Sequence, residues 1–198
     1  MDTRSRRILV VSAGHARNID TIRAHTDDAD AGVRASALEA LARAESLSDA
    51  DLLNAFADSA TEVRRRAAEL LARTFRRTLA PSLASALGDP EPDVVEAAAT
   101  ALGEDPEVDD AALDRLHDVA KSHDDALCRE SAIAALGSLA DPRSLVHILA
   151  AMADKPNVRR RAVVALTPYD DERADAAMTA ALDDKDRQVR TLAAELFG

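Results

Sequence analysis

The most reactive-looking stretch of the chain is nine residues long and reads SHDDALCRE, from Ser122 to Glu130. It holds the only cysteine of the protein, Cys128, with His123 five residues before it and two aspartates between them. A cysteine and a histidine can act as a nucleophile and its base, and His, Asp and Cys side chains are also metal ligands. Whether the stretch supports either chemistry depends on the elements that position it.

The same stretch is one copy of a repeat that runs along the chain. Six segments align, each with Ala four positions after its start and a large apolar residue eight positions after it. They are VRASALEAL from Val33, VRRRAAELL from Val63, VVEAAATAL from Val94, CRESAIAAL from Cys128, VRRRAVVAL from Val158 and VRTLAAELF from Val189. Apolar spacings of 0, 4, 5, 7 and 8 place these residues on one face of an α-helix. The segments therefore predict six amphipathic helices.

A further helical stretch precedes each of these segments. The clearest covers 140–154, where Asp141 is in N-cap position and Pro142 stands at the first helical position. The other stretches are 18–28, 48–58, 80–89, 109–121 and 170–184. The repeated unit is therefore a helix–turn–helix of about 31 residues.

A single helix pair cannot bury its apolar face alone, so successive pairs must stack. We expect an all-α fold, a right-handed α-solenoid of about six repeats in one domain, 1–198, whose concave face is lined by the second helices. An N-terminal half repeat, 1–17, caps the array. The expected repeats are 18–43, 48–73, 78–103, 109–137, 141–167 and 170–198.

Composition and charge narrow the classes of partner. The net charge of −11 disfavours a nucleic-acid partner, although residues 64–77 hold six Arg against one Glu. Residues 104–125 hold nine acids against two basic residues, and we interpret both runs as solvated helix faces. The apolar run ILVV is too short for a signal peptide or a membrane span, and a lone cysteine fits a reducing compartment. We expect a cytoplasmic protein with no membrane partner.

The pattern D-x-x-x-x-V-R-x-x-A-x-x-A-L-G resembles the HEAT-like repeat of bilin lyases, known as the PBS-lyase HEAT repeat. The preceding L-x-D-P-R-x-L-x-x-I-L helix of the fifth copy supports the resemblance. The resemblance covers nearly the whole chain and implies a scaffold fold, which hosts unrelated functions. It also implies a ladder between adjacent copies, in which Asp28, Asp58, Asp89, Asp154 and Asp184 meet Arg34, Arg64, Arg129, Arg159 and Arg190.

Three enzyme families with related helices need particular residue types in their sites, and the sequence shows whether those residues are present. Deoxyhypusine hydroxylase binds iron through His-Glu pairs, and no His-Glu dipeptide occurs in this sequence. A tetrapyrrole pocket of a bilin lyase, or the lesion platform of an alkylpurine DNA glycosylase, calls for aromatic rings. The chain has one Tyr, three Phe and no Trp. We therefore expect no catalytic, cofactor-binding or metal-binding residues and no cofactor.

The leading hypothesis is a non-catalytic scaffold or adaptor that binds a protein or peptide partner. The alternative is an enzyme or enzyme subunit of the bilin-lyase type; a HEAT-like oxidoreductase or a DNA glycosylase relative ranks below it. The candidate partner-binding residues lie on the concave-facing side of the second helices. They are Arg65, Arg66, Glu69, Glu96, Glu130, Arg160 and Glu195.

The repeat register also assigns the opening stretch. Cys128 occupies the place of the repeat's Val, so we expect a buried thiol with a raised pKa and little nucleophilic use. His123 stands where other copies have Asp, and Asp124 is the expected helix cap. We interpret His117 and His123 as polar residues of a solvated turn, with an opportunistic metal contact as the alternative.

The last repeat carries Leu192 where the other copies have Arg, Ala or Ser. A terminal repeat normally has a polar outer face. Because an apolar end can stack against another subunit, a homodimer through the C-terminal repeat is a further hypothesis.

Overall fold

The computed structural model describes residues 1–74 and 76–197, and in these ranges every regular element is a helix. The α-helices are α1 (Thr3–Ala16), α2 (Ile19–Arg23), α3 (Ala31–Arg43), α4 (Asp49–Phe56), α5 (Thr61–Thr74), α6 (Ala80–Ala86), α7 (Pro92–Gly103), α8 (Asp110–Ser122), α9 (Ala126–Leu139), α10 (Leu145–Ala151), α11 (Pro156–Leu166), α12 (Glu172–Ala181) and α13 (Arg187–Phe197). Two short 3₁₀ turns, η1 (Arg77–Leu79) and η2 (Pro142–Ser144), precede α6 and α10. The all-α prediction is confirmed.

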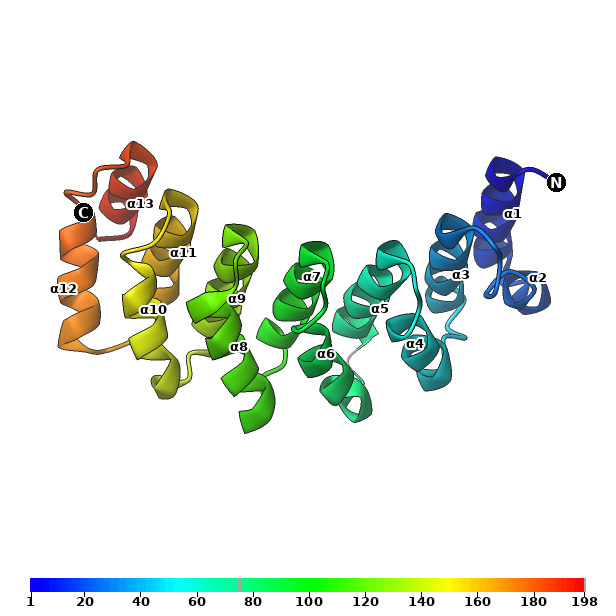
Figure 1. Ribbon diagram of the computed structural model, residues 1–198, viewed down its shortest axis with the longest axis horizontal. Coiled ribbons are helices and arrows are strands. Elements are labelled where there is room, and N and C mark those ends of the chain that lie inside the picture. The colour runs from blue at the N-terminus through cyan, green and yellow to red at the C-terminus, as the bar shows by residue number, and fades with distance from the viewer. Residues whose placement is uncertain (75, 198) are drawn as a thin grey trace. The chain divides into compact units, whose positions relative to one another are not determined.

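The chain divides into two compact units, an N-terminal unit, Met1–Ser82, and a C-terminal unit, Leu83–Gly198, with the boundary inside α6. In the N-terminal unit the second helices α1, α3 and α5 pack in sequence, while α2 and α4 lie against α3 and α5 (Figure 1). α1 lies within the expected N-terminal half repeat, 1–17, and packs on α3, while the capping role stays a prediction.

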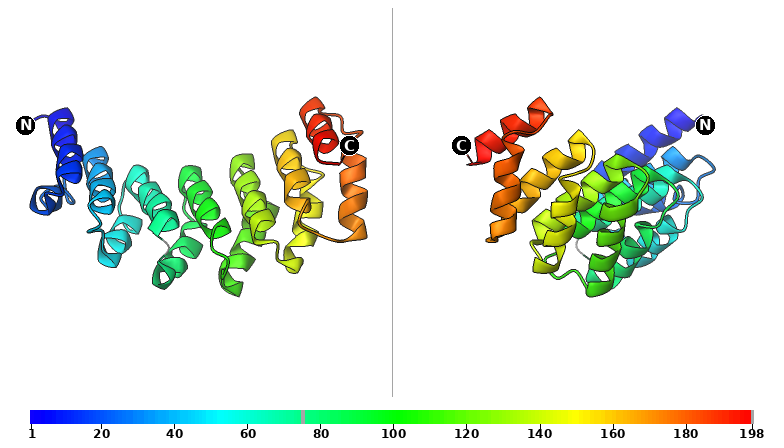
Figure 2. Two further views of the ribbon diagram at one scale, coloured as in Figure 1. Left: turned by 180° about the vertical axis from the view of Figure 1, so that it is seen from behind. Right: turned by 60° about the vertical axis from the view of Figure 1, so that its left-hand side comes forward.

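In the C-terminal unit α7, α9, α11 and α13 form the row of second helices, and α8, α10 and α12 form the row of first helices. The views of Figure 2 show this pairing from behind and from the side. Each unit thus has the stacked-pair architecture of an α-solenoid. The single domain over 1–198 stays a prediction, and Gly198, the end of the last expected repeat, lies outside the described residues.

Small residues allow the second helices to approach one another closely. The Cβ that Gly137 lacks would lie 2.6 Å from the Cβ of Ala165 and 2.7 Å from its Cα. Gly103 meets Ala135 in the same way, at 2.7 Å from its Cα. Gly stands nine positions after one repeat start and Ala seven positions after the next. This contact explains why the core relies on Ala, Leu and Val with few aromatic rings.

The Asp–Arg ladder is confirmed at three of the expected pairs, Arg34 with Asp58, Arg129 with Asp154 and Arg159 with Asp184. Arg64 and Arg190 each donate Nη1 to the carbonyl oxygen of the Asp in their own turn. The structure also gives the direction of the ladder. Arg34 donates through Nε and Nη2 to the carboxylate of Asp58 in the following repeat, at 2.8 and 2.7 Å. Its Nη1 donates to the carbonyl oxygen of Asp28 in its own turn, at 2.8 Å. The same bidentate pair joins Arg6 to Asp28, Arg129 to Asp154 and Arg159 to Asp184. Each pair therefore fixes the stacking of one repeat on the next.

At one place in the ladder neither the Arg nor the Asp of the pair is present. The third copy has Val95 in place of Arg, fully buried, and the fourth has His123 in place of Asp. His123 keeps the turn, because its Nδ1 accepts the N–H of Asp125 at 3.1 Å and its carbonyl accepts Nη1 of Arg129 at 2.6 Å. The paired loss of charge leaves no buried ion without a partner at this rung.

The expected cap Asp141 is confirmed, because it directly precedes η2 and accepts the N–H of Arg143 at 2.8 Å. Asp28 accepts the N–H of Asp30 before the helix, whereas Asp30 itself caps α3 by accepting the N–H of Val33 at 3.1 Å. Asp124 was wrongly predicted to cap α9. The cap is Asp125, which accepts the N–H of Leu127 at 2.7 Å, because only the residue directly before the helix reaches its first free amides.

Candidate functional site

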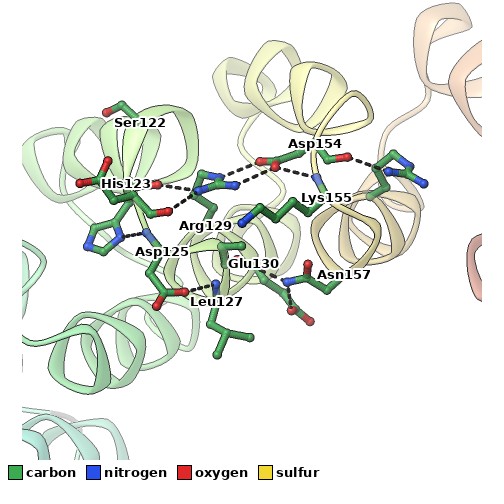
Figure 3. A network of polar contacts seen from close by, with 12 residues as sticks. Ser122, His123, Asp125, Leu127, Arg129, Glu130, Asp154, Lys155 and Asn157 are labelled. Atoms are coloured by element: carbon green, nitrogen blue, oxygen red, sulfur yellow. Dashed lines mark hydrogen bonds and ion pairs between the residues drawn. The ribbon is translucent and has the colours of Figure 1, made fainter. Parts of the chain in front are cut away.

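The candidate residues lie on the exposed face of the second helices. In the C-terminal unit, hydrogen bonds between neighbouring second helices close most of the spaces on this face, and we call the two residues of each such contact a crossing pair. A crossing pair joins the residue two places after one repeat start to the residue one place before the next start. Asn157 donates to Glu130 Oε2 at 2.8 Å, and Arg160 Nη1 donates to Gln188 Oε1 at 2.5 Å (Figure 3 shows the first pair). These hydrogen bonds fill the space between successive second helices.

In the N-terminal unit two of the crossing positions hold small residues. Gly32 faces Arg7, and Ala35 faces Glu62. A groove with room for about 110 Å³ opens there over α3, between α1 and α5. Its walls are formed by Arg7, Val11, Ala35, Ser36, Glu39, Ala40, Arg43, Glu62 and Arg66. Ala35, the small residue opposite Glu62, lines this groove, whereas the guanidinium of Arg7 fills the space beside Gly32.

A network of ion pairs borders the groove. Glu39 accepts from Arg73 at 2.7 Å and lies 3.4 Å from Arg66. Glu69 accepts from Arg65 at 2.7 Å, one turn along the same helix, and from Arg66 at 2.8 Å. The predicted candidates Arg65, Arg66 and Glu69 are therefore brought together, and of these three only Arg66 lines the groove.

The remaining candidates lie in the C-terminal unit, and Glu96 differs from the others. Its crossing partner in register is Leu127, which is 52% exposed and offers no hydrogen bond. Desolvation raises the pKa of Glu96, and the nearby carboxylates of Asp93, Asp125 and Glu130 raise it further. Glu130 and Arg160 are held in crossing pairs, while Glu195 lies exposed on α13.

The opening stretch SHDDALCRE is part of the repeat framework (Figure 3). Cys128 is fully buried, and its thiol lies 3.5 Å from the carbonyl oxygen of Pro92. Burial, followed by the charge of Glu96 nearby, raises the pKa of Cys128 to about 12. The thiol is therefore protonated at neutral pH and a poor nucleophile, as predicted.

The interpretation of His117 as a solvated turn residue is wrong. His117 lies inside α8 and is only 8% exposed, and its Nε2 is 2.9 Å from the hydroxyl of Ser144. Its ring stacks on that of His147 from α10, with centroids 4.1 Å apart and planes 5° from parallel. Its place on the apolar face of a helix makes it a packing residue between two first helices.

Sequence reasoning missed most of the groove walls. Arg7, Glu39 and Arg43 were not among the candidates, because these residues come together with the other groove walls only when α1, α3 and α5 pack. The available signal for Arg7 was Gly32, since the other second helices carry Glu, Asp, Leu, Asn or Gln at that position. In the described parts of the chain, no group of three or more His, Cys, Asp or Glu side chains is placed to hold a metal ion.

The C-terminal end is more enclosed than expected. Leu192 packs against the chain's own cluster of Val163, Ala181, Val189 and Ala193. The exposed apolar residues at this end are Leu196 and Phe197, at 42% and 38%. Leu192 is therefore partly buried by contacts within its own chain, and the homodimer stays a hypothesis. None of the helices described here combines the length and apolar character needed to cross a lipid bilayer.

Comparison with known proteins supports the architecture. A search of the curated proteins found no match. Among solved structures, the Escherichia coli protein YibA is 21% identical, with a TM-score of 0.69 over 93% of this chain and 68% of that one. The complex of CpcE and CpcF of phycocyanin lyase from Nostoc sp. PCC7120 is 21% identical, with a TM-score of 0.63 over 88% and 74%.

A designed armadillo repeat protein in complex with the peptide (KR)4 is 16% identical, with a TM-score of 0.60 over 100% of both chains. At these identities the likeness concerns the fold. A family model of HEAT repeats matches residues 50–137, 80–157 and 113–198, which together span most of the sequence. With the helix pairs and the ladder in place, this match shows that the chain belongs to the HEAT-repeat family.

Proposed function

We propose that the chain is a non-catalytic scaffold that binds a segment of a partner protein on the second-helix face of the N-terminal unit. The observation that carries the proposal is the groove over α3, which is lined by Ala35 at a position where hydrogen-bonded crossing pairs close two repeats of the C-terminal unit. Stacked helical repeats present such rows of side chains on rigid supports, which suits recognition of an extended segment.

The size of the groove favours a side chain over a small-molecule substrate. A volume of about 110 Å³ equals the share of roughly four water molecules in the liquid. Sites for drug-sized ligands or cofactors usually measure about 300 to 1,000 Å³. The fold itself is compatible with this use, since the designed neighbour carries a bound peptide and the CpcE structure is a complex of two proteins.

The proposal is tested by selecting binders from a random peptide library on the purified chain. The selected peptides should lose affinity at least tenfold for Arg66→Glu, which changes a groove wall. Arg173→Glu on α12 is the control, because its side chain is 65% exposed and pairs only with Asp171 of its own turn. Peptides that bind both variants equally well would contradict the location.

The alternative is an enzyme subunit of the bilin-lyase type, suggested by the likeness to CpcE and CpcF. The two hypotheses differ in a simple spectrum. A tetrapyrrole that binds the purified chain in stoichiometric amount, detected by visible absorbance, would favour the enzyme subunit. Absence of such binding together with peptide binding at the groove would favour the scaffold.

A further inference from the structure

The groove over α3 has an unusual arginine at its α1 wall. Arg7 directly follows Arg6, which pairs with Asp28 as the first rung of the ladder. Unlike Arg6, Arg7 lines the groove. The structure gives Arg7 no hydrogen bond and no ion pair with the residues that it describes, and Arg7 is exposed. A guanidinium carries five donors in a planar fork, so Arg7 holds a complete set of donors available to a ligand.

Gly32 creates the place that this guanidinium occupies. The position of a Cβ at Gly32 would lie 3.4 Å from Nη1 of Arg7 and 3.5 Å from its central carbon. A larger side chain there, as in every other second helix, would displace the fork from the first turn of α3. Gly32 therefore positions Arg7, which is itself one of the groove walls.

The other charges of the groove are distributed unevenly between its walls. Glu39 is neutralised twice, by Arg73 and Arg66. Arg43 donates to Nε2 of His15 at 2.9 Å, and no carboxylate among the described residues forms an ion pair with it. Of the acids that line the groove, Glu62 has no ion pair with the described residues, and it lies on the opposite wall, formed by α5. Asp30, whose Oδ1 also lies beside Gly32, is engaged as the cap of α3 through the N–H of Val33. Arg7 and Arg43 thus place positive charge on the α1 side of the groove.

Apolar atoms complete the groove. Val11 on α1 is 47% exposed, and Ala35 and Ala40 form the floor on α3. A short methylene stem over these residues would bury apolar area while its end group reached the guanidinium. The volume admits one side chain of about the size of Asp or Glu.

Resting on the proposed function above, we propose that the groove binds the carboxylate of an Asp or Glu side chain from an acidic segment of the partner, and that Arg7 is its principal contact. The guanidinium forms charge-assisted hydrogen bonds with the incoming carboxylate, and the stem of the acidic side chain packs on Val11. Arg7 is thereby the residue that selects an acidic over a neutral segment.

The test uses the whole chain and three fluorescein-labelled peptides of one length, built from Ala and Gly with Glu, Gln or Lys at the same places. Fluorescence anisotropy measures their affinity for wild type, Arg7→Gln and Arg4→Gln. Arg4 is the matched control, since it is an exposed arginine of α1 that does not line the groove. We expect preference for the Glu peptide, about a tenfold loss with Arg7→Gln, and no change with Arg4→Gln.

Other results overturn the inference, and they separate it from the proposed function. Equal losses for Arg7→Gln and Arg4→Gln would show diffuse attraction to a basic surface. Binding of the Gln or Lys peptide that responds to Arg66→Glu would keep the groove as a peptide site and remove the acidic partner. If a thymidine oligonucleotide binds more tightly than the Glu peptide and its binding depends on Arg7, the partner is a nucleic acid and not an acidic protein segment. If no peptide binds, both proposals fail.

Discussion

The two units of this protein use one repeat and one ladder, but they present different surfaces. Residues 1–82 contain 13 Arg and 12 Asp or Glu, whereas residues 83–198 contain 12 Lys or Arg and 24 Asp or Glu. In the C-terminal unit hydrogen-bonded crossing pairs close two of the spaces between second helices. In the N-terminal unit Ala35 lines a groove, and Gly32 makes room for the guanidinium of Arg7, which forms one of its walls. The framework residues set the stacking, and the crossing positions vary the surface.

We expect the largest loss of stability when an arginine of the ladder is replaced. Arg159 is 4% exposed, and its loss leaves the carboxylate of Asp184 desolvated without its bidentate partner. Arg159→Met should lower the free energy of unfolding by about 3 kcal/mol, measured by urea denaturation. Arg173→Met is the control, with an expected change of under about 0.5 kcal/mol because its pair with Asp171 is exposed. Similar losses of unfolding free energy in both variants would show that the buried ladder pairs stabilise the fold no more than an exposed pair does.

The second test restores the missing rung. Val95→Arg alone places a charge in a fully buried position, and His123→Asp alone supplies an acid without its partner. Together they recreate the pair seen between Arg34 and Asp58. A double-mutant cycle should give a coupling free energy of about 2 kcal/mol in favour of the pair. Additive effects would mean that this stack cannot accept a rung.

The third test compares two glycines with different neighbours. At Gly137 an added Cβ meets the backbone of Ala165 at 2.7 Å, so Gly137→Ala should destabilise the protein by about 1 to 2 kcal/mol despite better helix propensity. At Gly32 the nearest atoms are ends of the Asp30 and Arg7 side chains, which can move. Gly32→Ala should stay within about 0.5 kcal/mol and weaken binding of the Glu peptide. The reverse order of stabilities would contradict the packing described.

The smallest effect concerns the stacked histidines of the C-terminal unit. Desolvation, and after it the charge of the facing ring of His147, lowers the pKa of His117, while desolvation followed by Lys121 lowers that of His147. A lowered folded pKa means that the unfolded chain takes up protons first. Stability is therefore complete above the unfolded value of 6.5 and decreases as pH falls from there towards the folded values.

Thermal unfolding at about pH 7.5 and about pH 5.5 measures this loss, which should stay near 1 kcal/mol or less. Asp114, Asp118 and Asp141 act in the opposite sense and limit it. His147→Gln should reduce the pH dependence. An undiminished dependence in that variant would assign the effect to other groups.

The helices and the ladder were predictable because their signals are local and repeated. Each second helix carries its own apolar face, and Cys128 could be placed by register with the Val of other copies. The groove was not predictable from the pattern within single helices, because its walls come from α1, α3 and α5 and meet only when these helices pack. His117 was misassigned although it lies on the apolar face of α8 with the buried Leu113 and Leu116, and the ring of His147 from α10 stacks on it there.

Binding of a partner segment in the groove of the N-terminal unit can be followed residue by residue. The experiment is NMR chemical-shift mapping of the labelled chain, titrated with a peptide selected from the random library. If the groove is the binding site, the largest shift changes fall on α1, α3 and α5, centred on Arg7, Ser36 and Arg66. Changes centred on α7, α9 and α11, around Glu96 and Glu130, would contradict it.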